Sequence, residues 1–259
     1  RRTMARGPGA KGVPVTAPQA ARLPGDRLHL HHGPIDLVIG ADGPGREAAF
    51  AAATARFETI LQELVDELPD LRRDVRATTT LTGNVARAMQ AAVLPFAPVF
   101  VTPMAAVAGA VADEICAVMP AAGGLRRAYV NNGGDIALHL GAGATFTAAI
   151  AGVPGGRATL GFDSPVRGVA TSGWRGRSHS LGIADTVTVL ATSAARADAA
   201  ATLIANAVDL PGHPAIRRVP AHDLAPDSDL GAQPVTVDVG PLTPNEVTQA
   251  IARGAGVAR

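Results

Sequence analysis

The chain has 259 residues, of which 47% are hydrophobic and 17% are charged, and its formal net charge at pH 7 is +1. This composition supports one large globular core and excludes disorder over most of the chain. A net charge so close to zero also excludes strong electrostatic attraction to nucleic acid or to an anionic membrane surface. The expected partner is therefore a small molecule or another protein.

The N-terminal region and the cysteine content bear on domain organisation and location. Residues 1–26 are rich in Gly, Pro and Ala without periodicity, so they predict a flexible arm ahead of a single domain at residues 27–259. Apolar windows are broken by Pro, Gly or charge before they reach the roughly 20 residues of a membrane-spanning helix. Cys116 is the only cysteine and excludes an internal disulfide. We expect a cytoplasmic protein that is not embedded in a membrane.

Taken in chain order, the first elements are a hairpin and a long helix. Residues 27–32 and 35–41 alternate around a Gly-Pro turn and predict two paired strands. Apolar residues three and four apart predict the longest helix over residues 45–68, which a proline closes. A threonine-rich loop then leads to a short helix at 84–93, and residues 95–102 predict a strand interrupted by prolines.

The middle of the chain predicts a core helix followed by strands. Residues 104–119 are almost all Ala, Val and Ile, which favours an interior helix or a helix at a homodimer contact. Asn-Asn-Gly-Gly at residues 131–134 is typical of a type I′ turn, because Asn and Gly tolerate positive φ. It separates predicted strands at 129–131 and 135–140. Further strands are predicted at 145–151, 168–171, 186–191 and 235–239.

Two helices complete the prediction, at residues 197–206 and at residues 244–253 after a Thr243 cap. Helices inserted among hairpins predict an α+β fold with mostly antiparallel sheets. Residues 99–102 and 189–192 echo each other, each read as a strand ending in Thr before an Ala-rich helix. A domain built from two pseudo-repeated halves is therefore an alternative description.

One side of the helix at 197–206 is polar. Asp198, Thr202 and Asn206 stand four residues apart and so lie along one helix face. A solvent-exposed face normally carries Lys, Glu or Arg, and this helix has none after Arg196. A carboxylate and a hydroxyl one turn apart are hard oxygen ligands that suit Mg²⁺. We predict that Asp198 and Thr202 bind a metal, with a solvated polar face as the alternative.

The segment 168–180 predicts an anion site. Its glycines permit close backbone approach, and its hydroxyl and guanidinium groups can donate hydrogen bonds to a phosphate or a carboxylate. The donors are Thr171, Ser172, Arg175, Arg177, Ser178 and Ser180. The alternative is a polar surface loop with solvated arginines. No phosphate-loop or dinucleotide fingerprint is present, because the spacing and the terminal Lys-Ser/Thr are missing.

Three weaker patterns leave other chemistry open. The run from Gly176 to Ser180 approaches the nucleophile elbow of serine hydrolases, but it ends in Ser where the elbow needs Gly. His29, His31 and His32 could supply two zinc ligands from one strand face, although no Cys partner or His-Glu-x-x-His spacing accompanies them, and a plain edge strand is the alternative. The turn before Asp135 is either a plain hairpin or a set of backbone N–H groups presented to a ligand.

Taken together, these segments resemble a known family. Residues 130–136 (Val-Asn-Asn-Gly-Gly-Asp-Ile), 168–173 (Gly-Val-Ala-Thr-Ser-Gly) and 197–202 (Ala-Asp-Ala-Ala-Ala-Thr) look like the ordered blocks of the ApbE-like proteins, the FAD:protein FMN transferases. The chain is more similar still to an uncharacterised, UPF-type branch of that superfamily, through residues 102–113 and 176–182. The resemblance covers residues 27–210.

The resemblance implies an ApbE-like, T-fold-related α+β architecture with a flavin nucleotide site and Mg²⁺. On this basis Asp198 and Thr202 are expected to bind the metal, and Asp198, His179 and Ser178 are expected to be catalytic. With the two arginines added, the implied residues for FAD or FMN are Asn132, Gly133, Gly134, Asp135, Thr171, Ser172, Gly173, Arg175 and Arg177. Mg²⁺ would neutralise the pyrophosphate of FAD while AMP leaves and FMN passes to a hydroxyl of an acceptor protein.

One block departs from the family. Transferases have His-Ile-x-Asp-Pro-x-Thr-Gly after the Thr-Ser-Gly turn, whereas this chain has Gly-Arg-Ser-His-Ser-Leu-Gly-Ile-Ala-Asp at residues 176–185. His179 and Asp185 are then replacements or relics of that block. Two alternatives to FMN transfer stay open. The protein is a non-catalytic flavin-binding module, or it is a repurposed hydrolase or isomerase acting on a small carboxylate- or phosphate-bearing metabolite.

Overall fold

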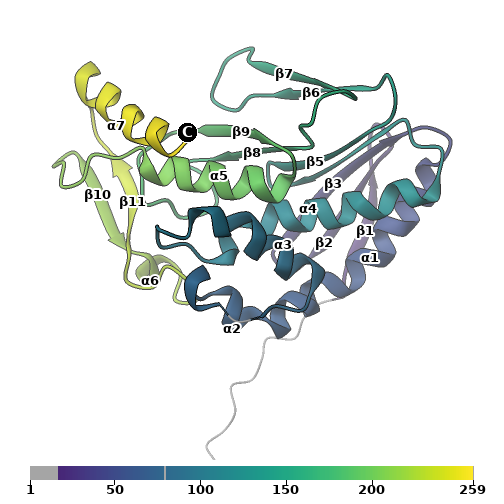
Figure 1. The fold of residues 1–259 in the computed structure, drawn as a ribbon, viewed down its shortest axis with the longest axis horizontal. Coiled ribbons are helices and arrows are strands. Elements are labelled where there is room, and N and C mark those ends of the chain that lie inside the picture. Colours follow the sequence, from purple (N-terminus) through teal and green to yellow (C-terminus); the bar gives the residue numbers. More distant parts are fainter. Residues whose placement is uncertain (1–16, 79, 259) are drawn as a thin grey trace, which may run out of the picture.

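The fold is built on one seven-stranded antiparallel sheet. The computed structural model describes residues 17–78 and 80–258. The strands of this sheet, in spatial order, are β1 (Gln19–Leu23), β2 (Arg27–His32), β3 (Ile35–Asp42), β4 (Arg127–Asn132), β5 (Asp135–Leu140), β8 (Gly168–Ser172) and β9 (Val187–Ala191). Figure 1 shows the sheet lying behind a layer of helices.

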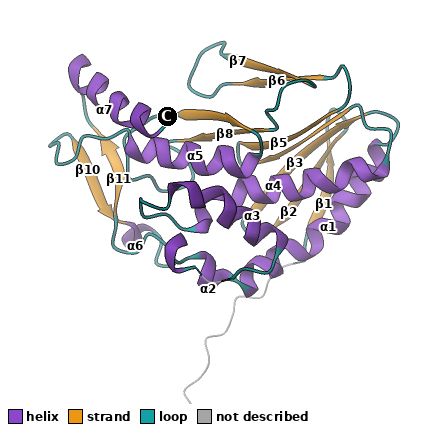
Figure 2. Ribbon diagram, viewed as in Figure 1, coloured by secondary structure: helices purple, strands orange, loops and turns teal. Residues whose placement is uncertain are grey.

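Four long helices cover one face of this sheet (Figures 1 and 2). They are α1 (Arg46–Asp66), α3 (Asn84–Val93), α4 (Val107–Val118) and α5 (Ala194–Ala207). Short helical turns join them, namely α2 (Leu68–Leu71), η1 (Val75–Ala77), η2 (Leu94–Phe96), η3 (Pro103–Ala106) and η4 (Met119–Ala122). Alternate residues of β2 and β3, such as Leu30 and Leu37, are fully buried against Phe57 and Ile60 of α1. The main core therefore lies between the sheet and the helices.

Smaller units flank this two-layer body. β6 (Thr145–Ala149) and β7 (Arg157–Gly161) form a separate hairpin over the other face of the sheet, where Leu160 packs on Leu138 and Leu140 of β5. β10 (Ile216–Pro220) and β11 (Pro234–Val239) form a second small sheet, with α6 (Ala221–Leu224) between them. The last helix, α7 (Pro244–Val257), follows β11.

The structure confirms an α+β fold with antiparallel sheets. The hairpin at residues 27–42, the helix at 84–93 and the strand at 135–140 lie within a residue of their predicted bounds. Gly133 and Gly134 have φ of +65° and +117°, as the predicted I′ turn requires. Thr243 caps α7, and its side chain and that of Glu246 form a reciprocal capping box.

Three local predictions are wrong. Residues 95–102 form no strand, because two prolines lack the N–H that a sheet needs, and residues 94–96 form a 3₁₀ turn. The echo between residues 99–102 and 189–192 therefore fails, since only the second segment reaches a strand. The ordered fold also begins earlier than residue 27, because residues 19–23 pair with β2. Residues 1–16 of the predicted arm lie outside the described residues.

The stretch 103–121 corrects the expectation about apolar windows. These 19 residues are helical and are long and apolar enough, by length and composition alone, to cross a membrane. However, the stretch carries Asp113 and Glu114, and several of its apolar side chains, including Val111 and Ile115, are buried in the main core. It contributes to the core of this domain, and the homodimer contact stays a prediction. The cytoplasmic location stays a prediction.

Candidate functional site

Two carboxylates from distant parts of the chain meet at one site. Asp135 is the first residue of β5, directly after the Gly133-Gly134 turn, and Asp198 lies on the second turn of α5. Both are only partly exposed. Burial raises the pKa of Asp135 to about 7. Burial, and then the negative charge of Asp135, raise the pKa of Asp198 well above its usual range. Two neighbouring recessed carboxylates repel each other, so the site favours a cation.

The backbone holds each carboxylate in place. Asp135 accepts a hydrogen bond from the backbone N–H of Thr171 on the neighbouring strand β8. Asp198 Oδ2 accepts the N–H of Gly109 at 3.0 Å, and the N–H of Ala108 also bonds this carboxylate. Ala108 and Gly109 belong to the first turn of α4, whose amides have no intrahelical acceptor. Asp198 therefore caps α4 and keeps further lone pairs for a ligand.

A carboxylate of α4 also caps the start of α5. Asp113 of α4 accepts the N–H groups of Ala194 and Ala195, the first two residues of α5, at 2.9 and 2.8 Å. The two helices thus cap each other, and burial raises the pKa of Asp113. They also pack closely, because a Cβ on Gly109 would lie 2.3 Å from the carbonyl oxygen of Ala194. Sequence reasoning missed both Asp113 and Gly109, although a carboxylate in an almost wholly apolar helix signals a buried polar partner.

The predicted glycine turn lies beside Asp135. The Asn132 side chain is buried and donates to the carbonyl of Ala108 at 3.1 Å, which ties the turn to the start of α4. Gly133 and Gly134 are exposed. The Arg177 guanidinium lies over Gly133, 3.8 Å from the position that a Cβ would take. Asn132, Gly133, Gly134 and Arg177 therefore lie on the Asp135 side of the carboxylate pair.

The Thr-Ser-Gly turn contributes mainly through its backbone. The hydroxyl of Thr171 is engaged with that of Thr188 across the β8–β9 pair, at 2.8 Å. Ser172 is partly exposed at the end of β8. Gly173 is buried, and a Cβ there would lie 2.1 Å from the carbonyl oxygen of Asp185. Only glycine fits at that position, so the close approach is between backbone segments of this chain.

Other predicted site residues lie in different surroundings. Arg175 stacks over Trp174 at 4.4 Å and pairs with Asp185 at 3.0 Å. Both charged residues line a cavity of about 760 Å³ beneath α7, whose lining does not include Asp198. The anion role predicted for Arg175 is therefore separate from the carboxylate pair.

The rest of the predicted anion segment is less engaged. Ser178 is exposed and His179 is partly exposed, and within residues 17–78 and 80–258 neither side chain makes a hydrogen bond. Thr202 is partly exposed one turn after Asp198. Asn206, the third member of the polar row, accepts the Ser180 hydroxyl at 3.1 Å and the Leu181 N–H at 2.9 Å. Asn206 therefore anchors the loop that carries Arg177, Ser178 and His179.

The donor set limits which cation would fit. Across the described residues, no three His, Cys, Asp or Glu side chains are grouped so that they could hold a metal ion. Asp135, Asp198 and the Thr202 hydroxyl are oxygen donors and too few for a closed protein cage. Mg²⁺ keeps several waters and binds through one or two carboxylates plus substrate phosphate. The residues present fit Mg²⁺ in that open mode.

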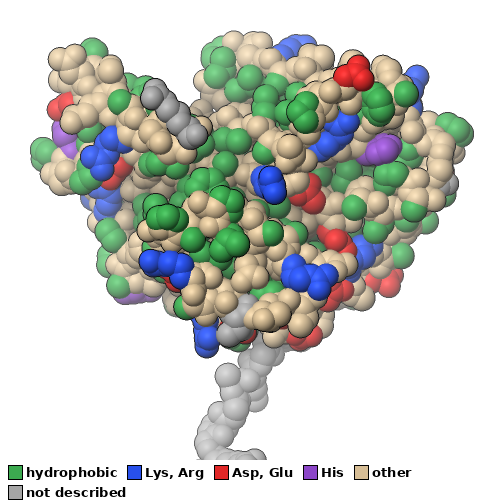
Figure 3. Space-filling view, viewed as in Figure 1, with side chains coloured by type: hydrophobic (Ala, Val, Ile, Leu, Met, Phe, Trp, Pro, Cys, Tyr) green, Lys and Arg blue, Asp and Glu red, His purple; other side chains and the backbone are tan. Residues whose placement is uncertain are grey.

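Charged side chains of both signs are mixed on the surface around the site (Figure 3). On the face that bears α3, α4 and α5, basic and acidic side chains are scattered among apolar ones (Figure 3). The first turn of α5 is not free to bind phosphate either, since Asp113 occupies the amides of Ala194 and Ala195 and Ser193 Oγ accepts that of Arg196. An anion would have to be held by the Gly133-Gly134 turn, Arg177 and a cation.

Comparison with known proteins places these residues in a family context. Residues 20–259 match the family described as "AbpE bacteria". The UPF0280 protein of Methanopyrus kandleri is 34% identical over 175 residues, which cover 66% of this chain and 69% of that protein. A UPF0280 protein of Methanothermobacter thermautotrophicus is 43% identical over 115 residues, covering 43% of this chain and 44% of the relative. A UPF0280 protein of Methanocella arvoryzae is 33% identical over 174 residues, covering 63% and 62%.

Proposed function

The chain belongs to the AbpE bacteria family, and we propose that it is a Mg²⁺-assisted enzyme of ApbE-like, T-fold-related architecture that acts on a flavin nucleotide. The specific reaction proposed is FMN transfer from FAD. The observation that carries the proposal is the pair Asp135 and Asp198: burial raises the pKa of both carboxyls, and the negative charge of Asp135 raises that of Asp198 further. Such a pair is unfavourable for stability alone, and perturbed carboxylates of this kind cluster at functional sites.

The described residues support distinct roles around this pair. Asp198, Asp135 and the Thr202 hydroxyl would hold Mg²⁺, which supplies charge neutralisation at a pyrophosphate when it is bound. The exposed backbone of Gly133 and Gly134 presents N–H groups to a phosphate. Arg177, which lies over Gly133, adds a cationic side chain at this turn.

The anchored loop supports the assignment of the remaining roles. Asn206 and Ser180 fix the base of the loop, and Ser178 and His179 project from it without hydrogen-bond partners among the described residues. We assign His179 to proton transfer with an acceptor hydroxyl, because the ring nitrogens of an imidazole can accept and donate a proton. Ser178 is assigned to contact with the transferred group. An acceptor protein is part of this proposal.

One observation favours a second candidate. Asp185 takes the place of the acidic residue in the transferase block, yet it pairs with Arg175 at the surface. An enzyme that keeps the carboxylate pair but has lost this block would act on a different small phosphate or carboxylate compound, by hydrolysis or isomerisation. A flavin-binding module without turnover is the third candidate.

The test is incubation of the purified protein with FAD, with and without Mg²⁺, followed by chromatography of AMP and FMN. We expect Mg²⁺-dependent AMP release that Asp198→Asn and Asp135→Asn abolish. Asp185→Asn is the matched control, because it removes an exposed carboxylate of the same size, and it should retain the release. Tight flavin binding without AMP would favour the binding module. FAD that stays intact and unbound in the presence of Mg²⁺ would refute flavin chemistry and favour the second candidate.

A further inference from the structure

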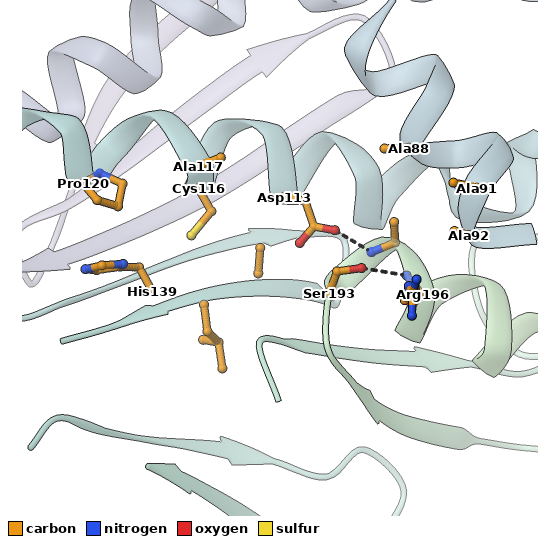
Figure 4. Close-up of a pocket in the computed structure, with 13 residues that line it drawn as sticks. Ala88, Ala91, Ala92, Asp113, Cys116, Ala117, Pro120, His139, Ser193 and Arg196 are labelled. Carbon is orange, nitrogen blue, oxygen red and sulfur yellow. Dashed lines mark hydrogen bonds between the residues drawn. The ribbon is translucent and has the colours of Figure 1, made fainter. Parts of the chain in front are cut away.

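A cavity of about 480 Å³ lies between α3, α4, β5 and the first turn of α5 (Figure 4). Its walls are mainly alanine side chains from these elements, joined by Pro120 and Leu138. The volume falls within the range typical of small-molecule sites. Five polar residues also line the cavity, namely Asp113, Cys116, His139, Ser193 and Arg196.

Two of these polar groups are not available to a ligand as charges. Both carboxylate oxygens of Asp113 face the first two amides of α5 and accept their hydrogen bonds. Burial raises the pKa of Cys116 to about 12, so its thiol is neutral and is not a nucleophile near pH 7. Cys116 therefore belongs to the apolar part of the wall.

The guanidinium of Arg196, in contrast, is free to pair with a ligand. Its side chain is exposed at the end of the cavity beside Ser193, as Figure 4 shows, and only its backbone N–H is engaged, by Ser193 Oγ. Throughout residues 17–78 and 80–258, no carboxylate lies within salt-bridge distance of its guanidinium, in contrast to Arg56 or Arg218. An arginine at an apolar wall offers two parallel N–H donors to one carboxylate.

His139 provides the opposite end of the cavity, beside Pro120 and Cys116 (Figure 4). Partial burial, and then the positive charge of Arg167, lower the pKa of His139. Its imidazole is therefore uncharged at neutral pH and acts as a hydrogen-bonding group. The cavity thus combines one cationic end, one neutral polar end and a mainly alanine-lined middle, in which the Asp113 carboxylate is already hydrogen-bonded to the α5 amides.

We propose that this cavity binds a small amphipathic monocarboxylate. The carboxylate pairs with Arg196, the apolar body lies on the alanine walls, and a neutral hydroxyl or carbonyl group meets His139. Phosphate fits less well, because Arg196 is the only cationic side chain in the lining and the amides of the α5 N-terminus are already occupied. The proposal stands independently of flavin chemistry, since the cavity lining contains neither Asp135 nor Asp198.

The test uses 4-hydroxybenzoate as the probe and 4-hydroxybenzamide, its uncharged analogue of similar shape, as the comparison. Binding to the full chain is measured by calorimetric titration. We expect 4-hydroxybenzoate to bind at least about tenfold more tightly than the amide. Arg196→Gln should reduce the carboxylate affinity to that of the amide and leave the amide affinity unchanged. Arg253→Gln removes an exposed arginine of α7 and should change neither affinity.

A second variant tests the location. Ala117 is exposed on α4 and lines the cavity, so Ala117→Phe should fill the entrance without disturbing the core and abolish binding of both probes. Equal affinity of the carboxylate for wild type and Arg196→Gln would overturn the proposal. So would unchanged binding in Ala117→Phe, or the absence of saturable binding to the wild type at about 10 mM probe.

Discussion

Asp135→Asn is expected to stabilise the metal-free protein at alkaline pH, although it removes a residue of the candidate site. The pKa of Asp135 rises from 3.8 to about 7 on folding, chiefly because the carboxylate is buried. Each pKa unit corresponds to about 1.36 kcal/mol. The shift therefore gives an upper bound of about 4 kcal/mol on the free energy that the charged form costs the native state. An Asn at this position keeps an acceptor for the Thr171 N–H and carries no charge.

The sign of the pH dependence follows from proton binding. Between 3.8 and about 7 the native state holds a proton on Asp135 that the unfolded chain releases, so wild-type stability falls as pH rises through this window. Below the unfolded-state value the two states bind protons equally. The increase in the free energy of unfolding caused by Asp135→Asn should therefore be close to zero near pH 4 and reach about 2 to 4 kcal/mol above pH 7. The lower end of this range applies if part of the cost of the buried charge belongs to Asp198, whose pKa is also raised.

The assay is urea unfolding followed by circular dichroism at about pH 4 and about pH 8, in the presence of a chelator. Asp185→Asn serves as the control, because its carboxylate is exposed and pairs with Arg175 at the surface. Millimolar Mg²⁺ should then raise the urea midpoint of the wild type but not that of Asp135→Asn. A variant that is less stable than wild type at pH 8, or equally stabilised at both pH values, would refute the reasoning.

Three further substitutions probe the packing around the site. Asp113→Ala leaves two buried amides of the first turn of α5 without acceptors, so we expect a loss of about 2 to 4 kcal/mol in unfolding free energy. Unchanged hydrogen exchange of the Ala194 amide would contradict it. Gly109→Ala places a Cβ 2.3 Å from a backbone oxygen and should lower the free energy of unfolding by about 2 kcal/mol or more. The control is Gly256→Ala, whose Cβ would meet no atom within 4 Å, so its stability in thermal melts should be unchanged or higher. Both ring nitrogens of the buried His32 have no hydrogen-bond partner within the described chain. His32→Leu should therefore raise the free energy of unfolding, measured with urea, by about 1 to 2 kcal/mol. A lower free energy of unfolding in this variant would contradict the prediction.

Patterns within short stretches of the sequence predict most of the helices, strands and turns. Alternation in residues 27–32 and 35–39 places every second side chain against the core, and the period of three to four in residues 46–66 turns Phe57 and Ile60 inward. Paired glycines in the turn at residues 133–134 supply the positive φ that a tight hairpin needs. Spacing along α5 also put Asp198 on a polar face. These features depend on neighbours within a few residues, so they are legible without the fold.

Which polar groups meet depends on how the helices pack against each other and against the sheet. Asp198, Thr202 and Asn206 were grouped by spacing, but packing gives Asp198 to the start of α4 and Asn206 to the loop at residues 180–181. The pairing of Asp198 with Asp135, and the capping of α5 by Asp113, join segments with no periodic relation along the chain. Helix ends expose amides that any nearby carboxylate can satisfy, and which carboxylate is near depends on how α4, α5 and the sheet pack. Burial then sets the pKa of each group, and burial is a property of the assembled core that a linear pattern does not contain.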